Sequence, residues 1–166
     1  MPDRAGDATE TGAPGDAAEL VFRRARLDDV ASIVVMMADD HLGAQRESPD
    51  DLTPYRAAFE VIDADPHQLL AVVERAGSVI GTLQLTFLTG LGRRGATKAQ
   101  VQAVRVASHL RSHGIGAQMM AWAAEQARAH GCSLIQLTTH GSRADAHRFY
   151  DRLGYHQTHR GYTLPL

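Results

Sequence analysis

Two glycines at a strand-to-helix junction, Gly114 and Gly116, constrain the fold of this chain more than any other feature. They follow a β-patterned run at 101–106 and open a helix-patterned run at 114–130. The start of a helix exposes unpaired backbone N–H groups and the positive end of the peptide dipoles, which together bind an anion such as phosphate. Because glycine has no Cβ, an anion can approach the backbone closely at both positions. The junction therefore predicts an α/β fold with a phosphate-binding turn.

A second motif lies at residues 145–155, where the sequence reads DAHRFYDRLGY. The two motifs, in this order, resemble the GNAT superfamily of acyl-CoA-dependent N-acetyltransferases. That family has a phosphate loop of the form Arg/Gln-x-x-Gly-x-Gly/Ala, which Arg111, Gly114 and Gly116 match. Its later helix has the form Ala-x-x-Phe-Tyr-x-x-x-Gly-Phe/Tyr, and the matching residues are Ala146, Phe149, Tyr150, Gly154 and Tyr155. The resemblance is tight over 97–155 and looser over 20–96 and 156–166.

The hydrophobic pattern divides the chain into strands and helices. We expect strands at 20–24, 68–74, 79–87, 99–106 and 134–138, with a closing strand at 162–164. Helices are predicted at about 28–43, 54–63, 114–130 and 143–153. The resemblance implies a mixed, mainly antiparallel sheet of six or seven strands with helices on both faces. It also implies that the fourth and fifth strands diverge and that the CoA derivative enters the gap between them.

The first 19 residues differ in composition from the rest. They are rich in Ala, Gly, Asp, Thr and Pro and have hardly an apolar anchor before Leu20. Such a segment buries too little surface to offset its ordering entropy, so 1–19 is predicted to be a disordered leader. Residues 20–166 are then expected to form a single domain.

Charge and composition exclude several classes of partner. The formal net charge is −2, and no apolar run approaches the length of a membrane span, so neither nucleic acid nor a membrane is expected as a partner. Cys132 is the only cysteine, which rules out an internal disulfide and is compatible with a cytoplasmic location. Homodimers are common among members of the resembled family, although nothing in this sequence specifies an interface.

Acetyl-CoA is the co-substrate that the resemblance implies. Its pyrophosphate would lie on the loop 111–117, and its pantetheine arm would run beside the strand at 104–106, where a backbone N–H polarises the thioester carbonyl. The expected binding residues are Val104, Arg105, Val106, Arg111, Ser112, His113, Gly114, Ile115, Gly116, Ala117, His140, Ala146, Phe149, Tyr150 and Arg152.

Tyr150 is the candidate general acid. A phenol stays protonated at neutral pH and can give a proton to a departing thiolate. The alternative is that Tyr150 only packs in the core with a satisfied hydroxyl.

The general base is harder to assign, because Gln102 stands where many family members have a Glu, and an amide cannot accept the proton. His140, after the fifth strand, can accept a proton near neutral pH, but a purely hydrogen-bonding role fits it equally well. Asp39, Asp40 and His41 are alternatives on the acceptor side, and a solvated acidic face explains them as readily.

Two other patterns in the sequence resemble binding motifs but do not predict a site. Residues 90–95 form a literal G-x-G-x-x-G, but the next segment is β-patterned, so no helix receives a pyrophosphate, and a loop between strands is expected. The pairs His109/His113 and His156/His159 lack a Cys or carboxylate at ligand spacing, and no metal is expected.

The predicted function is transfer of an acetyl group from acetyl-CoA to a primary amine by direct attack in a ternary complex. The acceptor, a small molecule or a peptide amine, is not readable from the sequence. The alternative is a non-catalytic acyl-CoA-binding regulatory or sensory module, which Gln102 and the unassigned base motivate.

Overall fold

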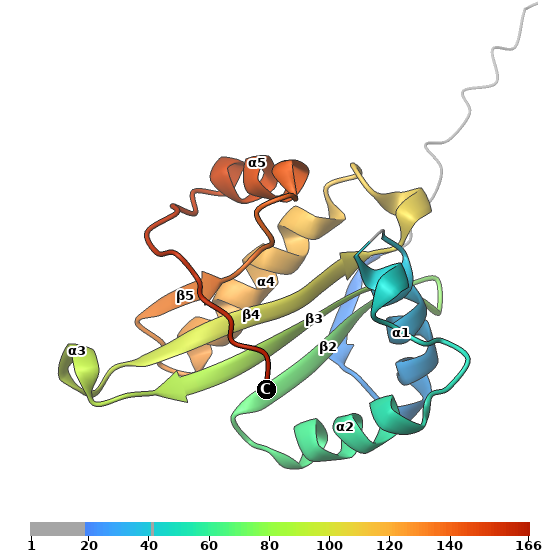
Figure 1. The fold of residues 1–166 in the computed structure, drawn as a ribbon, viewed down its shortest axis with the longest axis horizontal. Coiled ribbons are helices and arrows are strands. Elements are labelled where there is room, and N and C mark those ends of the chain that lie inside the picture. The colour runs from blue at the N-terminus through green and yellow to red at the C-terminus, as the bar shows by residue number, and fades with distance from the viewer. Residues whose placement is uncertain (1–18, 41) are drawn as a thin grey trace, which may run out of the picture.

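Five strands form one mixed sheet in the order β1-β2-β3-β4-β5 (Figure 1). The computed structural model describes residues 19–40 and 42–166. The pairs β1–β2, β2–β3 and β3–β4 are antiparallel, and β5 runs parallel to β4. The strands are β1 (Val21–Arg24), β2 (Gln68–Arg75), β3 (Ser78–Thr89), β4 (Thr97–Val106) and β5 (Leu134–Leu137).

Five helices and three short 3₁₀ turns connect the strands. The helices are α1 (Val30–Ala38), α2 (Thr53–Ala64), α3 (Gly92–Gly95), α4 (Ile115–Ala129) and α5 (Ala144–Arg152). The 3₁₀ turns are η1 (Leu27–Asp29), η2 (Gly43–Gln45) and η3 (Ser108–Leu110). Every predicted helix and the first five predicted strands are present, with boundaries that differ by a few residues.

Helices cover both faces of the sheet, as predicted. The alternation of side chains along β2 shows this directly. Leu70 and Val72 pack in one core with α1 and α2, whereas Ala71 and Val73 pack in another with α4. Because β2 is buried on both sides, its sequence reads as a continuous apolar run rather than as an alternating one.

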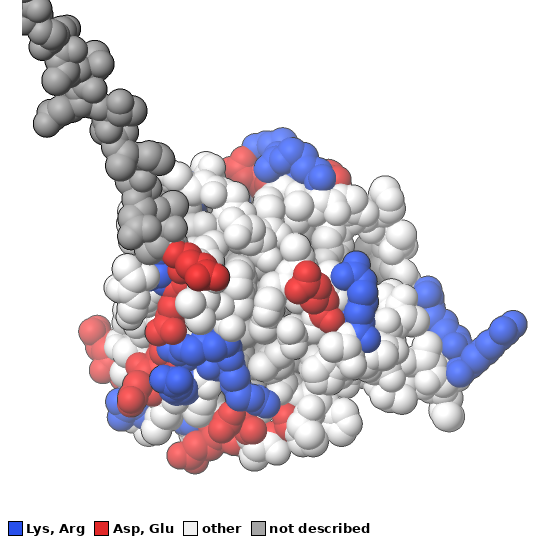
Figure 2. Space-filling view, turned by 180° about the vertical axis from the view of Figure 1, so that it is seen from behind, with Lys and Arg blue, Asp and Glu red and all other residues white. Residues whose placement is uncertain are grey.

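Helix α4 lies behind the sheet and buries one stripe of small and flexible apolar side chains. The stripe consists of Ile115, Met119, Met120, Ala123 and Ala127. Figure 2 shows this side of the molecule, where charged side chains are sparse over the middle and no continuous basic surface is visible outside the grey residues.

Helix α1 ends at Ala38, earlier than the predicted end near Gly43. The carboxylate of Asp40 explains the difference, because its Oδ1 accepts hydrogen bonds from the amides of Leu42 at 3.0 Å and Gly43 at 2.7 Å. An aspartate that bonds the following amides offers the backbone an alternative to the helix. The chain therefore turns into η2, and Asp40 is held at the end of α1.

The segment 90–95 connects two neighbouring strands of the sheet, as predicted. Strands β3 and β4 pair up to Thr89 and Thr97, and α3 is the short turn between them. Arg93 and Arg94 have positive φ angles of 53° and 62° inside this turn. A dinucleotide fingerprint requires a helix after the glycines, and the extended β4 follows instead.

A bulge in β4 determines which side chains face α1. Thr82 pairs with Arg105 and Gln84 pairs with Gln102, so Leu83 alone stands opposite two residues of β4. One of these, Ala103, has a φ of 50°. The extra residue shifts the alternation, and Gln102 and Arg105 therefore lie on the same face although three positions separate them.

Strands β4 and β5 are paired over only part of their length. The pairing runs from Lys98 with Leu134 to Val101 with Leu137, whereas β4 continues to Val106. The carboxyl-terminal part of β4 is therefore left without a partner on that edge among the described residues. The pantetheine arm was predicted beside this stretch, in which the carbonyls of Val104 and Val106 accept hydrogen bonds from the side chains of Arg105 and Arg111.

The predicted strand count of six or seven is wrong, because the described sheet has five strands. The expected closing strand at 162–164 is absent, and residues 155–166 form neither helix nor strand. Tyr162 and Leu164 are 94% and 80% exposed. A segment of three residues forms few hydrogen bonds to a neighbouring strand. It therefore becomes a strand only where the fold places the edge of a sheet beside it. The predicted leader falls almost entirely on residues 1–18, which lie outside the described residues.

Candidate functional site

The predicted phosphate turn lies between the end of β4 and the start of α4. Ser112 and Gly114 have φ angles of 67° and 78°, and Gly114 caps α4 in the left-handed conformation. A Cβ built on Gly114 would have no atom within 4 Å, so the space above this backbone is open. Glycine is required here by the backbone conformation and not by crowding.

The amides at the start of α4 point to an anion site. The N–H groups of Ala117 and Gln118 are the first to bond within the helix, both to the carbonyl of Gly114, at 3.1 and 3.2 Å. The amides of Gly114, Ile115 and Gly116 have no acceptor among the described residues. Since the first turn of α4 carries no acidic side chain, nothing there cancels the positive end of the helix.

Gly116 joins the phosphate turn to α5. A Cβ at this position would lie 3.2 Å from Cζ of Phe149, which is closer than most real contacts allow. The two motifs found in the sequence therefore meet in space, and α5 is placed by its contact with the first turn of α4. Ala117 follows on that same turn.

The side chain of Arg111 bonds to protein groups. Its Nε donates to the carbonyl of Val106 at 3.2 Å, and one terminal nitrogen donates to the carboxylate of Asp39 at 3.0 Å. The guanidinium and this carboxylate are both nearly half exposed, so the ion pair is weak and a phosphate can compete for it. His113 turns its Nδ1 toward the carbonyl of Arg111, at 2.8 Å.

Tyr150 lies on α5, partly buried among aromatic rings. Its ring centroid is 5.1 Å from that of Phe149 and 5.8 Å from that of Tyr155. Burial raises the pKa of Tyr150 above that of a free phenol, and the guanidinium groups of Arg105 and Arg143 partly offset the rise. The hydroxyl makes no hydrogen bond to the described residues and is not fully buried. Ala146 is half-buried on the same helix, whereas Arg152 is exposed near its end.

His140 is exposed in the loop after β5. Its Nδ1 accepts a hydrogen bond from the amide of Ser142 at 3.2 Å and lies 2.7 Å from the Ser142 hydroxyl. The neutral ring therefore carries its proton on Nε2. The basic nitrogen of His140 thus faces a hydroxyl that can pass a proton to it.

An ionic cluster that sequence analysis did not find lies on the α1 side of the sheet. It joins Asp40 at the end of α1, Arg105 on β4 and Arg143 just before α5. Arg105 was predicted to contribute only through its strand, and Arg143 was not predicted at all. No local pattern marks the cluster, because Asp40 and Arg143 are 103 positions apart in the sequence.

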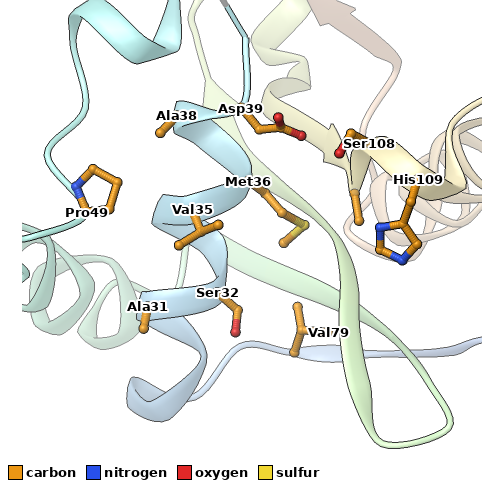
Figure 3. A pocket seen from close by; sticks show the side chains of 11 residues that line it. Ala31, Ser32, Val35, Met36, Ala38, Asp39, Pro49, Val79, Ser108 and His109 are labelled. Carbon is orange, nitrogen blue, oxygen red and sulfur yellow. The ribbon is translucent and has the colours of Figure 1, made fainter.

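A groove of about 650 Å³ lies between α1, the start of β3 and the turn after β4. In Figure 3, Val35, Met36 and Asp39 line it from α1 and the turn after it, and Ser108 and His109 close it on the other side. No residue that lines it belongs to the predicted donor site or to the predicted catalytic pair. Two lining residues contact Arg111 of that site: Asp39 through an ion pair, and Ser108, whose carbonyl accepts a hydrogen bond from the amide of Arg111 at 3.2 Å.

No group of three or more His, Cys, Asp or Glu side chains is placed to hold a metal ion within residues 19–40 and 42–166. In this part of the chain, no helix combines the length and the apolar character needed to cross a membrane.

Comparison with known proteins gives consistent matches. The model of the Acetyltransferase (GNAT) family matches residues 34–155. An aminoalkylphosphonate N-acetyltransferase from Salmonella typhimurium is 31% identical over 145 residues, which are 87% of this chain and 90% of that protein.

Solved structures match over most of their length. One is described as a transcriptional regulator from Bacillus halodurans C-125; it is 38% identical, with a TM-score of 0.86, and the match covers 89% of this chain and all of that one. A glucosamine-6-phosphate N-acetyltransferase from Arabidopsis thaliana has a TM-score of 0.73 at 15% identity, covering 89% of this chain and 98% of that one. At 15% identity, the match to the Arabidopsis thaliana enzyme shows a similar fold and nothing more.

Proposed function

Because the chain belongs to the acetyltransferase (GNAT) family and is an N-acetyltransferase, we propose that it transfers an acetyl group from acetyl-CoA to a primary amine by direct attack in a ternary complex. The acetyl group arrives as a thioester, which is the chemistry that acetyl-CoA supplies when bound. Everything else in the reaction falls to side chains and amides of this chain.

The proposal rests on the unpaired amides of Gly114, Ile115 and Gly116 and on the open space beside Gly114. Unpaired N–H groups at a helix start suit a diphosphate, and a side chain at Gly114 would take up part of the space beside them. Arg111 is close enough in the loop to exchange Asp39 for a phosphate oxygen. The unpaired end of β4, at 104–106, then supports the pantetheine arm.

We assign the proton that the leaving thiolate needs to the hydroxyl of Tyr150. Its raised pKa keeps it protonated throughout the neutral range, and the hydroxyl is not committed to another described group. A positioned general acid typically contributes about a hundredfold or more to the rate.

For the amine proton we propose a relay through Ser142 to His140. The amine N–H gives its proton to Oγ of Ser142, and the proton of that hydroxyl passes to Nδ1 of His140, 2.7 Å away. The histidine ends as an imidazolium, which returns the proton to solvent because the ring is exposed.

For the acceptor, the first class to test is the aminoalkylphosphonates, because a relative that is 31% identical acts on them by name. The sequence alone left the acceptor open. Small amines without an acid group and amino acids are the comparison classes.

The test is to follow release of the CoA thiol from acetyl-CoA with purified protein and a panel of amines. Acetyl-CoA-dependent thiol release that requires an amine is the expected result. Tight binding of acetyl-CoA with no release on any amine would instead favour the non-catalytic module that Gln102 suggested. An absence of acetyl-CoA binding would remove the phosphate turn as the donor site.

A further inference from the structure

Two arginines share one carboxylate oxygen on the α1 face of the sheet. One terminal nitrogen of Arg143 lies 2.5 Å from Oδ2 of Asp40, and one of Arg105 lies 3.7 Å from the same oxygen. The other oxygen, Oδ1, is occupied by the amides of Leu42 and Gly43. Asp40 therefore turns a single oxygen toward two guanidinium groups, which leaves an excess of positive charge between these three side chains.

The donors of Arg105 are not all satisfied. Its Nε is buried and has no hydrogen-bond partner among the described residues, and the one hydrogen bond that its guanidinium makes there goes to the carbonyl of Val104, at 2.9 Å. Burial lowers the pKa of Arg105, and the charge of Arg143 acts in the same direction, while Asp40 opposes both. A buried donor without a partner is costly, and a bound anion would supply the acceptor.

The cluster lies beside the proposed chemistry. Tyr150 is near enough to both guanidinium groups for their charges to lower its pKa. Gln102 shares the face of β4 with Arg105 because of the bulge at Ala103. The other acid that acts on Arg105 is Glu47, whose carboxylate accepts a hydrogen bond from the hydroxyl of Tyr55 at 3.0 Å.

We propose that Arg105 and Arg143 form the binding subsite for an acid group on the acceptor, and that this enzyme is selective for small amines that carry a phosphonate. Asp40 holds Arg143 in place through Oδ2 and is itself fixed by two amides. Two guanidinium groups match a group with up to two negative charges and three oxygens. The inference rests on the proposed function and adds to it the residues that recognise the acceptor.

The experiment compares two amines of similar size. In 2-aminoethylphosphonate the acid group is present, and in propylamine a methyl group stands in its place. The value of kcat/KM is measured for both at saturating acetyl-CoA in the natural protein, in Arg143→Met and in Arg105→Met. Arg56→Met is the matched control, because Arg56 is exposed on α2 and forms no ion pair with Asp40.

We expect the natural protein to prefer the phosphonate and each cluster variant to lose about ten- to a hundredfold of that preference, mainly through KM. The Arg56→Met variant should keep the preference unchanged. Equal use of both amines by the natural protein, or an unchanged preference in Arg143→Met and Arg105→Met, would overturn the subsite while leaving acetyl transfer intact.

Binding gives a second readout that does not depend on turnover. With acetyl-CoA present at saturation, titration of methylphosphonate should release heat with the natural protein and not with Arg143→Met, and thermal unfolding shows whether each variant is folded. If no amine is acetylated but methylphosphonate binds through Arg143, the proposed function fails and the anion site stands. If methylphosphonate binds equally well to both proteins, the anion site is wrong.

Discussion

Replacing Gly114 with alanine tests the donor site most directly. Gly114 has a φ of 78°, and a Cβ there meets no atom within 4 Å. The substitution therefore creates no clash, and its cost to the fold is the strain of a left-handed backbone, about 1–2 kcal/mol. In a domain of this size each kcal/mol lowers the melting temperature by about 2–4 °C.

Gly131 provides a matched control at the other end of the same helix. Its φ is 69°, and a Cβ there also meets nothing within 4 Å. Gly131→Ala should therefore cost the fold about as much as Gly114→Ala. Only the substitution at Gly114 adds a methyl group at the start of α4, where the phosphate site is proposed.

The expected difference lies in the affinity for acetyl-CoA. Displacing a phosphate from one charge-assisted hydrogen bond costs about 1.5–3 kcal/mol, which is about ten- to a hundredfold in Kd. Gly114→Glu should lower the affinity for acetyl-CoA further than Gly114→Ala, since it adds a negative charge to the site. Isothermal titration measures the affinities, and urea unfolding measures the stabilities. Equal acetyl-CoA affinity in Gly114→Ala and Gly131→Ala would refute the assignment of the turn as a phosphate site.

Three further predictions concern other residues. Tyr150→Phe should lower kcat about a hundredfold or more without changing acetyl-CoA affinity or melting temperature, because the hydroxyl has no described partner; an undiminished kcat would remove Tyr150 from the mechanism. Ser142→Ala and His140→Gln should reduce kcat by similar factors, and the double variant by no more than either alone, whereas additive losses would argue against a relay. The carboxylate of Asp29 accepts two hydrogen bonds from Arg23, at 2.7 and 2.9 Å, and these bonds are the main reason why the pKa of Asp29 is lowered. The ionised carboxylate therefore stabilises the folded protein at neutral pH, and this stabilisation is lost as the pH falls below the usual aspartate pKa of about 4. In urea unfolding, Asp29→Asn should lower the free energy of unfolding by about 1.5–3 kcal/mol at pH 7 and have little effect in strong acid. Asp28 is exposed, so Asp28→Asn is the control and should change the free energy of unfolding at neither pH. If the loss in Asp29→Asn persists in acid, packing and not charge is its cause.

The order of helices and strands could be predicted because local signals mark it. Ala76 and Gly77 have φ angles of 50° and 77°, the conformation of a tight hairpin turn, and the AGS sequence there predicted such a turn between β2 and β3. Gly114 and Gly131 likewise bound α4 on both sides, as predicted. Each of these signals acts through the backbone of a few neighbouring residues, so one sequence is enough to read it.

The predicted closing strand shows where local signals are not enough to predict the structure. The alternation at Tyr162, Leu164 and Leu166 is a sound β pattern, yet all three side chains are exposed and residues 155–166 remain irregular. A strand exists only with a partner, and the availability of the edge of β5 is a property of the whole sheet. Counting patterned segments therefore overestimated the number of strands.

The sequence by itself determined the strand-turn-helix segment around Gly114 and the family to which the protein belongs. Only the tertiary structure decided where the charged side chains meet, because the bulge at Ala103 turns Arg105 toward Asp40, and the fold then brings Arg143 to the same carboxylate. Backbone preferences act over a few residues, whereas an ion pair depends on distances between segments that the chain joins only by folding.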